Sequence, residues 1–90
     1  MLPIKRTTQF KKDFKKAIKQ NKDIDHLKSV IIKLSNQEKL DRRYYDHPLS
    51  GKLKNFRDCH IEPDWVLIYQ VTDDELILVR VGSHSELFDA

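Results

Sequence analysis

The sequence predicts an α+β domain, in which a short N-terminal strand and a helical hairpin pack on one face of an antiparallel sheet. The first half has apolar residues at helical spacing, and the second half has three strand-like runs separated by turn residues. The expected order is therefore strand, helix, helix, three strands and a short C-terminal helix. Since 90 residues allow only one hydrophobic core, residues 1–90 are expected to form a single domain.

The first half predicts a strand over residues 2–6, followed by two helices. Thr7 or Thr8 can cap the first helix, and Asp23 can cap the second. The expected apolar face of the first helix holds Phe10, Phe14, Ala17 and Ile18, and that of the second holds Ile24, Leu27, Ile31 and Leu34.

Three strands are predicted over residues 53–61, 65–71 and 76–81. The last two are apolar on both faces, which favours the middle of the sheet. Ser83 and Glu86 have the spacing of a capping box and predict a short terminal helix. Residues 36–51 show no clear period, and a loop of this length in a compact domain is usually functional or disordered. The aromatic residues and leucines in the segment argue against disorder.

Composition excludes several classes of protein. With 34% charged residues and a mean hydropathy of −0.64, the chain has no apolar run near the roughly 20 residues of a membrane helix. The N-terminus lacks the apolar segment of a signal peptide, so a cytoplasmic location is expected. The single Cys59 cannot form an internal disulfide, and there is no Cys-x-x-Cys pair for zinc.

Charge is distributed unevenly along the chain. Residues 1–22 hold eight basic residues and one acidic residue, a net charge of +7, whereas residues 47–90 carry a net charge of −4. A polyanion would be drawn to the basic face of the first helix. For a lysine run alone, a solvated helix face is the more common explanation.

Strand pairing brings histidines and an acid together. In antiparallel hairpins, the numbers of opposed residues should sum to about 125 across the first turn and about 147 across the second. His60 then faces Trp65, and Asp64 faces Ser83, the residue before His84. Imidazoles and a carboxylate at one end of a sheet can perform acid–base chemistry.

Arg80 lies near these residues within an apolar strand, where an unpaired cation would be costly. It is expected to reach a phosphate at the open end of the sheet, or to pair with an acid such as Asp58. Together with the acid–base groups, this predicts a site that cleaves a phosphodiester. His26, which lies away from these segments, is expected to be solvated or satisfied in the core.

Four segments of the chain carry recognisable motifs: residues 7–16 (TTQFKKDFKK), 45–51 (YDHPLSG), 57–69 (RDCHIEPDWVLIY) and 80–88 (RVGSHSELF). Together they resemble the YafQ branch of the RelE-like toxins. These are endoribonucleases of bacterial toxin–antitoxin systems. The resemblance runs from about residue 4 to residue 88. It implies a RelE-like fold, cleavage of messenger RNA, typically in the ribosomal A site, and silencing by a cognate antitoxin.

The resemblance also implies particular residues and a mechanism. The matched catalytic positions are His47, His60, Asp64 and His84. The positions expected to shape the site and contact RNA are Trp65, Arg80 and Phe88. The family needs no metal or other cofactor, and the RNA 2′-hydroxyl attacks the adjacent phosphate. We expect His84 to be the general acid and His60 or Asp64 the base, while His47 assists proton transfer or binds phosphate.

The sequence is also compatible with three other functions. Three histidines and an aspartate could bind zinc, although no His-x₃₋₅-His spacing supports this. The chain could be a non-catalytic module that binds nucleic acid through its basic helix. It could also be an interaction protein whose grooves only hold an antitoxin.

Overall fold

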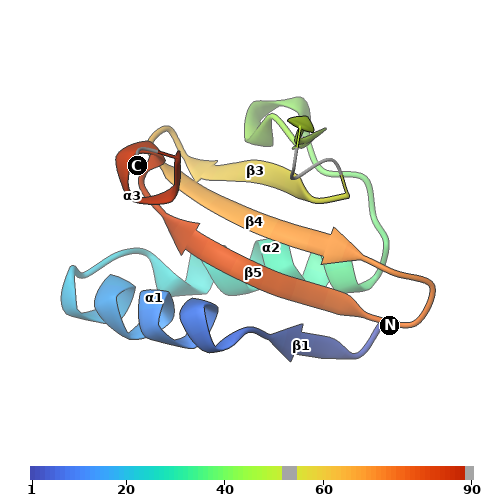
Figure 1. The fold of residues 1–90 in the computed structure, drawn as a ribbon, viewed down its shortest axis with the longest axis horizontal. Helices are drawn as coiled ribbons and strands as arrows, with labels where there is room; N and C mark the ends of the chain where they lie inside the picture. Colours follow the sequence, from blue (N-terminus) through green and yellow to red (C-terminus); the bar gives the residue numbers. More distant parts are fainter. Residues whose placement is uncertain (52–54, 89–90) are drawn as a thin grey trace.

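A computed structural model describes residues 1–51 and 55–88. Its helices are α1 (Thr8–Lys19), α2 (Ile24–Ser35), the 3₁₀ helix η1 (Arg42–Tyr44) and α3 (His84–Phe88). Its strands are β1 (Ile4–Arg6), β2 (His47–Pro48), β3 (Arg57–Glu62), β4 (Trp65–Val71) and β5 (Leu76–Gly82). They form one sheet in the order β1-β5-β4-β3-β2 (Figure 1).

The predicted fold class and element order are confirmed, with β4 in the middle of the sheet and β5 beside it. The expectation of a purely antiparallel sheet is wrong for β1, which runs parallel to β5 with Ile4 opposite Leu76. Because β4 already pairs with one edge of β5, only the other edge is open to β1. The predicted strand over residues 53–61 begins at Arg57, and residues 53 and 54 lie outside the described residues.

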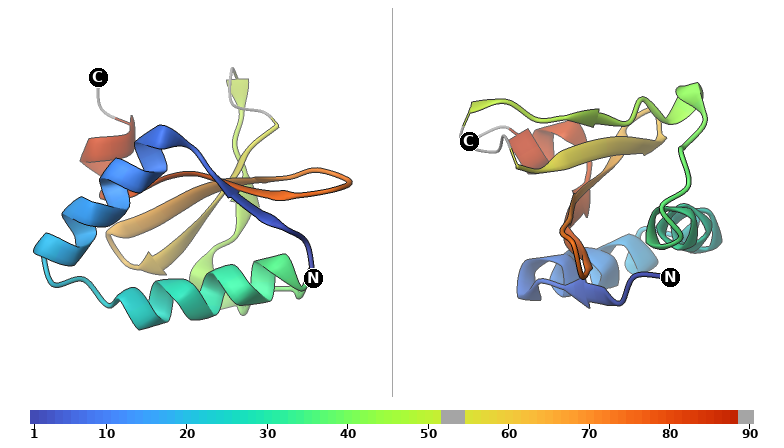
Figure 2. Two further views of the ribbon diagram at one scale, coloured as in Figure 1. Left: turned by 90° about the horizontal axis from the view of Figure 1, so that it is seen from below. Right: turned by 90° about the vertical axis from the view of Figure 1, so that its right-hand side faces the viewer.

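Helices α1 and α2 pack against the sheet, and the segment that contains η1 and β2 runs along the β3 edge, at the opposite end of the strand order from β1 (Figure 2). The core between helices and sheet is apolar and includes Phe10, Ala17, Leu27, Val30, Leu67, Leu76 and Leu78. No helix within the described part of the chain has the length and apolar character needed to cross a membrane.

Helix α1 begins as expected, because the Thr7 hydroxyl accepts a hydrogen bond from the Phe10 amide at 2.9 Å. Its buried face differs from the prediction. Phe10 and Ala17 are buried, but Ile18 is 51% exposed and Phe14 is only partly buried. The face is rotated so that the carboxylate of Asp13 points inward, where it finds partners on β5.

Helix α2 follows the prediction more closely. Asp23 is the N-cap, and its carboxylate accepts the His26 amide at 3.0 Å. Leu27, Ile31 and Leu34 are buried as expected, whereas Ile24 is only partly buried. In the long segment that follows, Leu40 and Tyr44 reach the core, which explains why a stretch without periodicity is ordered.

The predicted capping box at the C-terminal end is also present. The Ser83 amide donates to Glu86 Oε1 at 2.9 Å, and the Glu86 amide donates to Ser83 Oγ at 3.2 Å. The box starts α3 with His84 as its first residue. It therefore fixes the position of a predicted site residue.

Candidate active site

The β3–β4 hairpin holds the first predicted site residues, and its register differs from the expected one by one residue. His60 pairs with Val66, and Glu62 pairs with Trp65, so the turn consists of Pro63 and Asp64 alone. A bulge between His60 and Glu62 absorbs the difference. Consequently His60 lies on the sheet face opposite to the helices, and Asp64 lies at the tip of the hairpin.

The β4–β5 hairpin has the expected register near its turn, where Val71 pairs with Leu76. The register then shifts, since Tyr69 pairs with Leu78 but Ile68 pairs with Arg80, which leaves Val79 as an extra residue. The Val79 carbonyl accepts a hydrogen bond from Thr7 Oγ1 at 2.7 Å.

This second bulge has a consequence for the site. By the expected register Asp64 faces Ser83, but one extra residue in β5 brings His84 against Asp64 instead. Asp64 and His84 therefore lie at the same end of the sheet, as the expected strand pairing predicts. The expected pairing does not include the bulge, because no glycine or turn residue marks it in the sequence.

Asp64 and His84 form a close pair. Asp64 Oδ1 lies 2.8 Å from His84 Nδ1, and it also accepts the His84 backbone amide at 3.0 Å. The backbone hydrogen bond and then the ring lower the pKa of the Asp64 carboxyl. Since Asp64 engages Nδ1, the Nε2 atom of His84 remains for proton transfer. Both side chains are open to a substrate, with exposed fractions of 47% for His84 and 72% for Asp64.

The aromatic rings form a continuous row across this face. The rings of His60 and His84 have centroids 4.9 Å apart, and Phe88 follows at 6.1 Å from His84. On the other side, Tyr45 lies 5.5 Å from His60 and 4.5 Å from His47. The structure therefore brings all three predicted catalytic histidines into one row, with His47 at its far end.

His47 is fixed by its backbone and its ring. Its strand β2 pairs with β3, with His47 opposite Asp58. The ring nitrogen Nδ1 lies 2.8 Å from the Tyr45 carbonyl oxygen and 3.0 Å from Asp58 Oδ1. Tyr45 itself adopts a left-handed backbone, with φ of 47°, which turns the chain at this point.

A partly buried polar network anchors the loop before His47. Asp46 Oδ1 accepts hydrogen bonds from Tyr69 Oη at 2.6 Å and from Arg57 Nε at 3.1 Å. Tyr69 is only 1% exposed, and burial followed by its bond to Asp46 raises the pKa of its hydroxyl. Because residues 36–51 show no hydrophobic period, the register of this loop and these contacts could not be predicted from the sequence.

Asp58 was the acid suggested as an alternative partner of Arg80, and that alternative is wrong. It is 3% exposed and lies beside His47. Its Oδ1 atom is close to His47 Nδ1, yet no donor among the described residues reaches it with hydrogen-bond geometry, because Nδ1 bonds the Tyr45 carbonyl. Burial raises the pKa of the Asp58 carboxyl. Electrostatic attraction to His47, His60 and His84 acts in the opposite direction and is the smaller effect.

Replacing Asp58 with asparagine should stabilise the fold at neutral pH. A raised pKa means that folding favours the protonated carboxyl, so wild-type stability falls as pH rises through the unfolded and then the folded pKa. The asparagine amide does not titrate, so the variant has no such loss of stability. Between about pH 3 and about pH 7, the free energy of unfolding of Asp58→Asn, measured by urea denaturation, should rise relative to that of the wild type. Equal pH dependence of the two proteins would contradict this account.

Arg80 has an acidic partner, but on α1. Arg80 Nε donates to Asp13 Oδ2 and Nη2 donates to Oδ1, both at 3.1 Å, and the Val81 amide also donates to Oδ2 at 3.2 Å. Asp13 is 9% exposed, and its hydrogen bonds raise the pKa of Arg80. Fork-to-fork pairing of this kind fixes the guanidinium plane. The Arg80 side chain is still 33% exposed, so it remains accessible to a substrate.

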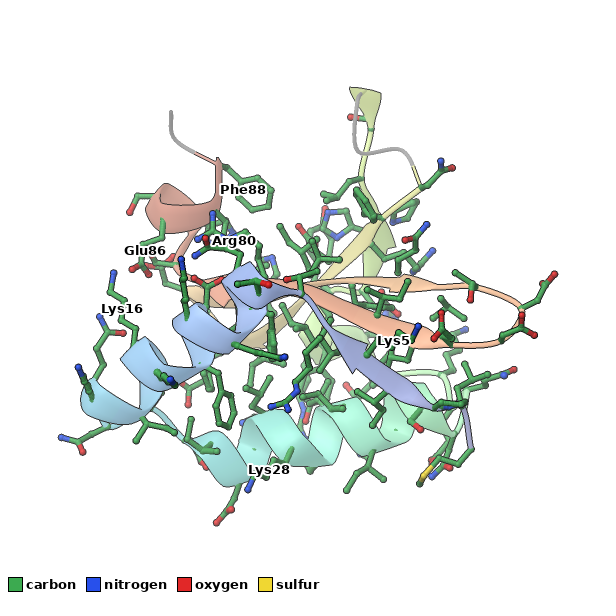
Figure 3. The ribbon with its side chains drawn as sticks, turned by 60° about the horizontal axis from the view of Figure 1, so that its bottom comes forward. Lys5, Lys16, Lys28, Arg80, Glu86 and Phe88 are labelled. Atoms are coloured by element: carbon green, nitrogen blue, oxygen red, sulfur yellow. The ribbon has the colours of Figure 1, made fainter. Side chains whose placement is uncertain are left out.

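A salt bridge joins α1 to α3. Figure 3 shows Lys16 and Glu86 facing each other, with Arg80 and Phe88 at the same end of the molecule. Lys16, followed by the Ser83 amide, lowers the pKa of Glu86 to about 2. The basic helix α1 thus helps to hold the helix that carries His84.

The other two residues expected to contact RNA differ in their surroundings. Phe88 is 41% exposed and can offer a ring face to a base. Trp65 is 2% exposed and belongs to the core, so it can shape the site but presents almost no surface for stacking. Trp65 alternates along β4 with Leu67 and Tyr69, which also belong to the core, so its ring lies on the helix side of the sheet.

These features define a small α+β protein with an open row of imidazoles, one of them paired with a carboxylate, beside a fixed guanidinium. Such a site supports acid–base chemistry on an anionic substrate.

Comparison with known proteins identifies the family. The model of the family described as "Bacterial toxin of type II toxin-antitoxin system, YafQ" matches residues 2–89. The chain is 46% identical over 81 residues to mRNA interferase toxin YafQ of Escherichia coli strain K12, covering 89% of this chain and 88% of that protein.

Solved structures agree. A copper-bound mutant toxin from Helicobacter pylori is 51% identical, with a TM-score of 0.95 over 98% of this chain and 100% of that one. YafQ in the E. coli DinJ–YafQ complex is 44% identical, with a TM-score of 0.90 over 98% and 99% of the two chains. The chain belongs to the YafQ family of bacterial type II toxins.

Proposed function

We propose that this chain is the toxin of a type II toxin–antitoxin pair and acts as a metal-independent endoribonuclease on messenger RNA. The observation that carries the proposal is the His84–Asp64 pair at 2.8 Å, with the His60 ring 4.9 Å from that of His84. The E. coli relative that shares 46% of its residues is named an mRNA interferase toxin, which supports the same activity here.

The proposed reaction is attack of an RNA 2′-oxygen on the adjacent phosphorus. The bond from phosphorus to the 5′-oxygen breaks, giving a 2′,3′-cyclic phosphate and a 5′-hydroxyl. One group takes the proton of the 2′-hydroxyl and another gives a proton to the leaving 5′-oxygen, each transfer contributing on the order of 10² to 10⁴ in rate.

The residues have distinct proposed roles in this reaction. His84 is the general acid, because the carboxylate of Asp64 on Nδ1 orients its ring and leaves Nε2 for the proton transfer. His60 is then the better candidate for the base, since Asp64 is engaged by two His84 donors. Arg80 supplies positive charge at the phosphate, and Phe88 offers a ring for stacking.

His47 lies farther along the row and assists through phosphate binding or proton transfer. Asp58 acts as a positioning residue beside it, because its buried carboxylate lies 3.0 Å from His47 Nδ1 and its strand pairs with that of His47. This arrangement needs no metal-activated water, since the substrate supplies the nucleophile.

The proposed partners are a cognate antitoxin, messenger RNA and the ribosome, met in the cytoplasm. One solved relative is a DinJ–YafQ toxin–antitoxin complex, which supports an antitoxin partner for this chain. Helix α1 carries five lysines between Lys11 and Lys19. This basic face suits both the RNA backbone and an acidic segment of an antitoxin.

A substrate with one 2′-deoxy nucleotide at the cleavage point tests the mechanism. The all-ribose RNA should be cut, with ribosomes supplied, to a fragment ending in a 2′,3′-cyclic phosphate. The 2′-deoxy substrate should bind equally well and resist cutting at that position, because it lacks the nucleophile. Activity should persist in excess EDTA.

Two outcomes would reject the proposal. Cutting at the 2′-deoxy position, or loss of activity in EDTA with recovery in zinc, would require a metal-activated water. Binding of RNA with steep salt dependence but no cleavage would instead leave a non-catalytic binding module.

A further inference from the structure

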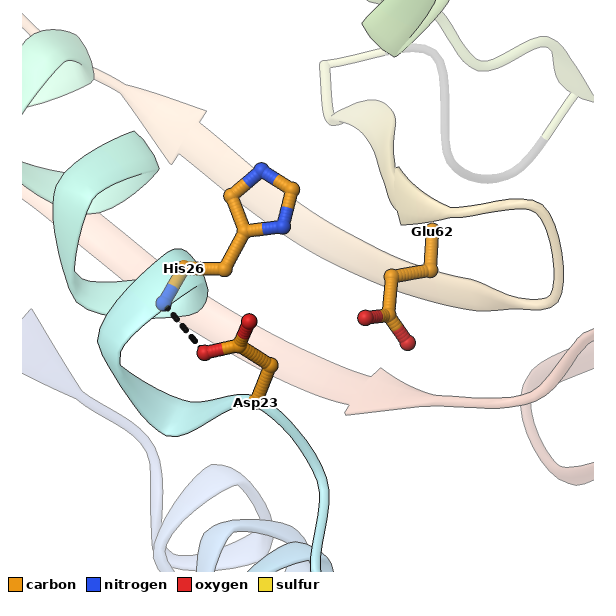
Figure 4. Close-up of side chains that lie close together, drawn as sticks. All are labelled: Asp23, His26 and Glu62. Atoms are coloured by element: carbon orange, nitrogen blue, oxygen red, sulfur yellow. Dashed lines mark hydrogen bonds between the residues drawn. The ribbon is translucent and has the colours of Figure 1, made fainter.

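A second group of ionisable side chains lies away from the row of catalytic candidates. Asp23 at the start of α2, His26 one turn later and Glu62 at the end of β3 point toward one another (Figure 4). One ligand atom from each residue lies within 4.8 Å of the others. We propose that these three side chains bind a divalent transition-metal ion such as zinc.

The charges of the cluster favour a cation. In the described part of the chain, no lysine or arginine nitrogen lies within 4.0 Å of either carboxylate. Two carboxylates at this range repel each other, and a divalent ion between them removes the repulsion. Two cations line the surfaces next to the cluster and have other contacts. Arg43 donates to Tyr44 Oη at 3.1 Å and lies over the Tyr44 ring, and Lys22 lies over the Trp65 ring.

His26 is held as metal-binding histidines usually are. Its Nε2 atom is 3.0 Å from Tyr44 Oη, so one ring nitrogen is fixed by a hydrogen bond. Figure 4 shows the other ring nitrogen on the side of Glu62. A hydrogen bond from Nε2–H leaves the Nδ1 lone pair free, and partners of this kind orient ligating imidazoles.

The carboxylates can bind without loss of structure. Asp23 caps α2 through Oδ1, so its second oxygen is available to an ion. The ligand atoms would have to close to about 3.3 Å in a tetrahedral site with bonds of about 2.0–2.1 Å. Asp23 is exposed, and His26 and Glu62 line a groove of about 510 Å³ that leaves room for water in the remaining positions.

The three side chains offer one imidazole nitrogen and two carboxylate oxygens, and this set of donor atoms determines which metal ions bind well. This donor set suits zinc and its neighbours better than calcium or magnesium, which prefer oxygen alone. A bound ion would link the start of α2 to the turn that carries Asp64, two residues beyond Glu62. The site is distinct from the catalytic candidates, none of which is one of its three ligands.

Zinc titration followed by calorimetry tests the proposal. Because the row of histidines can bind zinc too, the experiment uses a background with His60→Gln and His84→Gln. That background protein should bind one zinc per chain. Adding Glu62→Gln, or Asp23→Asn, which keeps the N-cap, should weaken binding at least about tenfold.

The matched control is Asp25→Asn on the same background, an exposed carboxylate of α2 outside the cluster. It should bind zinc with unchanged affinity. Circular dichroism spectra that coincide across the variants would exclude unfolding as the cause of weaker binding. No zinc uptake by the background protein, or equal affinity in Glu62→Gln and Asp25→Asn, would overturn the proposal.

Discussion

His84→Ala should lower RNA cleavage by about 10² to 10⁴, the usual contribution of one positioned acid or base. Its ring lies 2.8 Å from Asp64 and 4.9 Å from the His60 ring by centroid, so its loss removes the proposed proton donor. The fold should barely change, since the side chain is 47% exposed. Asp64 keeps its hydrogen bond to the backbone amide of residue 84.

Two measurements separate chemistry from folding in this variant. Single-turnover cleavage at saturating ribosome concentration reports the chemical step, and a thermal melt reports stability. Asp64→Asn should lose activity as well, while Asp73→Asn, an exposed carboxylate in the β4–β5 turn at the other end of the sheet, should not. Full cleavage by a folded His84→Ala protein would remove His84 from the mechanism.

The pH profile offers a further check. With a general acid and a general base of similar kind, the rate should pass through a maximum whose two flanks belong to the coupled groups. Removing His84 should flatten one flank. Changes in binding alone would lower the whole curve and leave its shape intact.

Sequence alone predicted the order of elements, their caps and the end of the sheet that carries the site. Caps are local, since Thr7, Asp23 and Ser83 each act within three residues. Strand register is less local. The bulges at Ile61 and Val79 move residues by one position, and nothing in their side chains marks them.

Polar residues caused the other errors, because a hydrophobic pattern does not say which polar side chains are buried. The predicted apolar face of α1 did not include Asp13, but Asp13 is buried against Arg80. Asp58 was suggested as an alternative partner of Arg80, but it lies beside His47. In each case the partner comes from a distant segment, 67 residues away for Asp13, and only the fold reveals it.

The rotation of α1 changes which phenylalanine stabilises the protein. A face of Phe10, Phe14, Ala17 and Ile18 would make the two phenylalanines equivalent. In the structure Phe10 is 1% exposed, Phe14 only packs against the edge of the core, and their rings are 6.1 Å apart. The inward turn of Asp13 toward β5 accounts for the difference.

Phe10→Ala should therefore lower the free energy of unfolding by about 3–5 kcal/mol, the range for a phenylalanine removed from a closed core. Phe10 belongs to the close-packed core cluster, so its neighbours can relax only partly into the cavity that it leaves. Phe14→Ala should cost clearly less, because water already reaches part of that ring. Lys15→Ala, on the exposed face of α1, is the matched control and should change stability little.

Urea denaturation of the three variants at one pH measures these differences directly. The expected order of loss is Phe10→Ala, then Phe14→Ala, then Lys15→Ala. Equal losses for the two phenylalanines would restore the face predicted from periodicity. Such a result would also place Asp13 away from β5, and it would leave Arg80 without the partner that fixes its guanidinium beside the site.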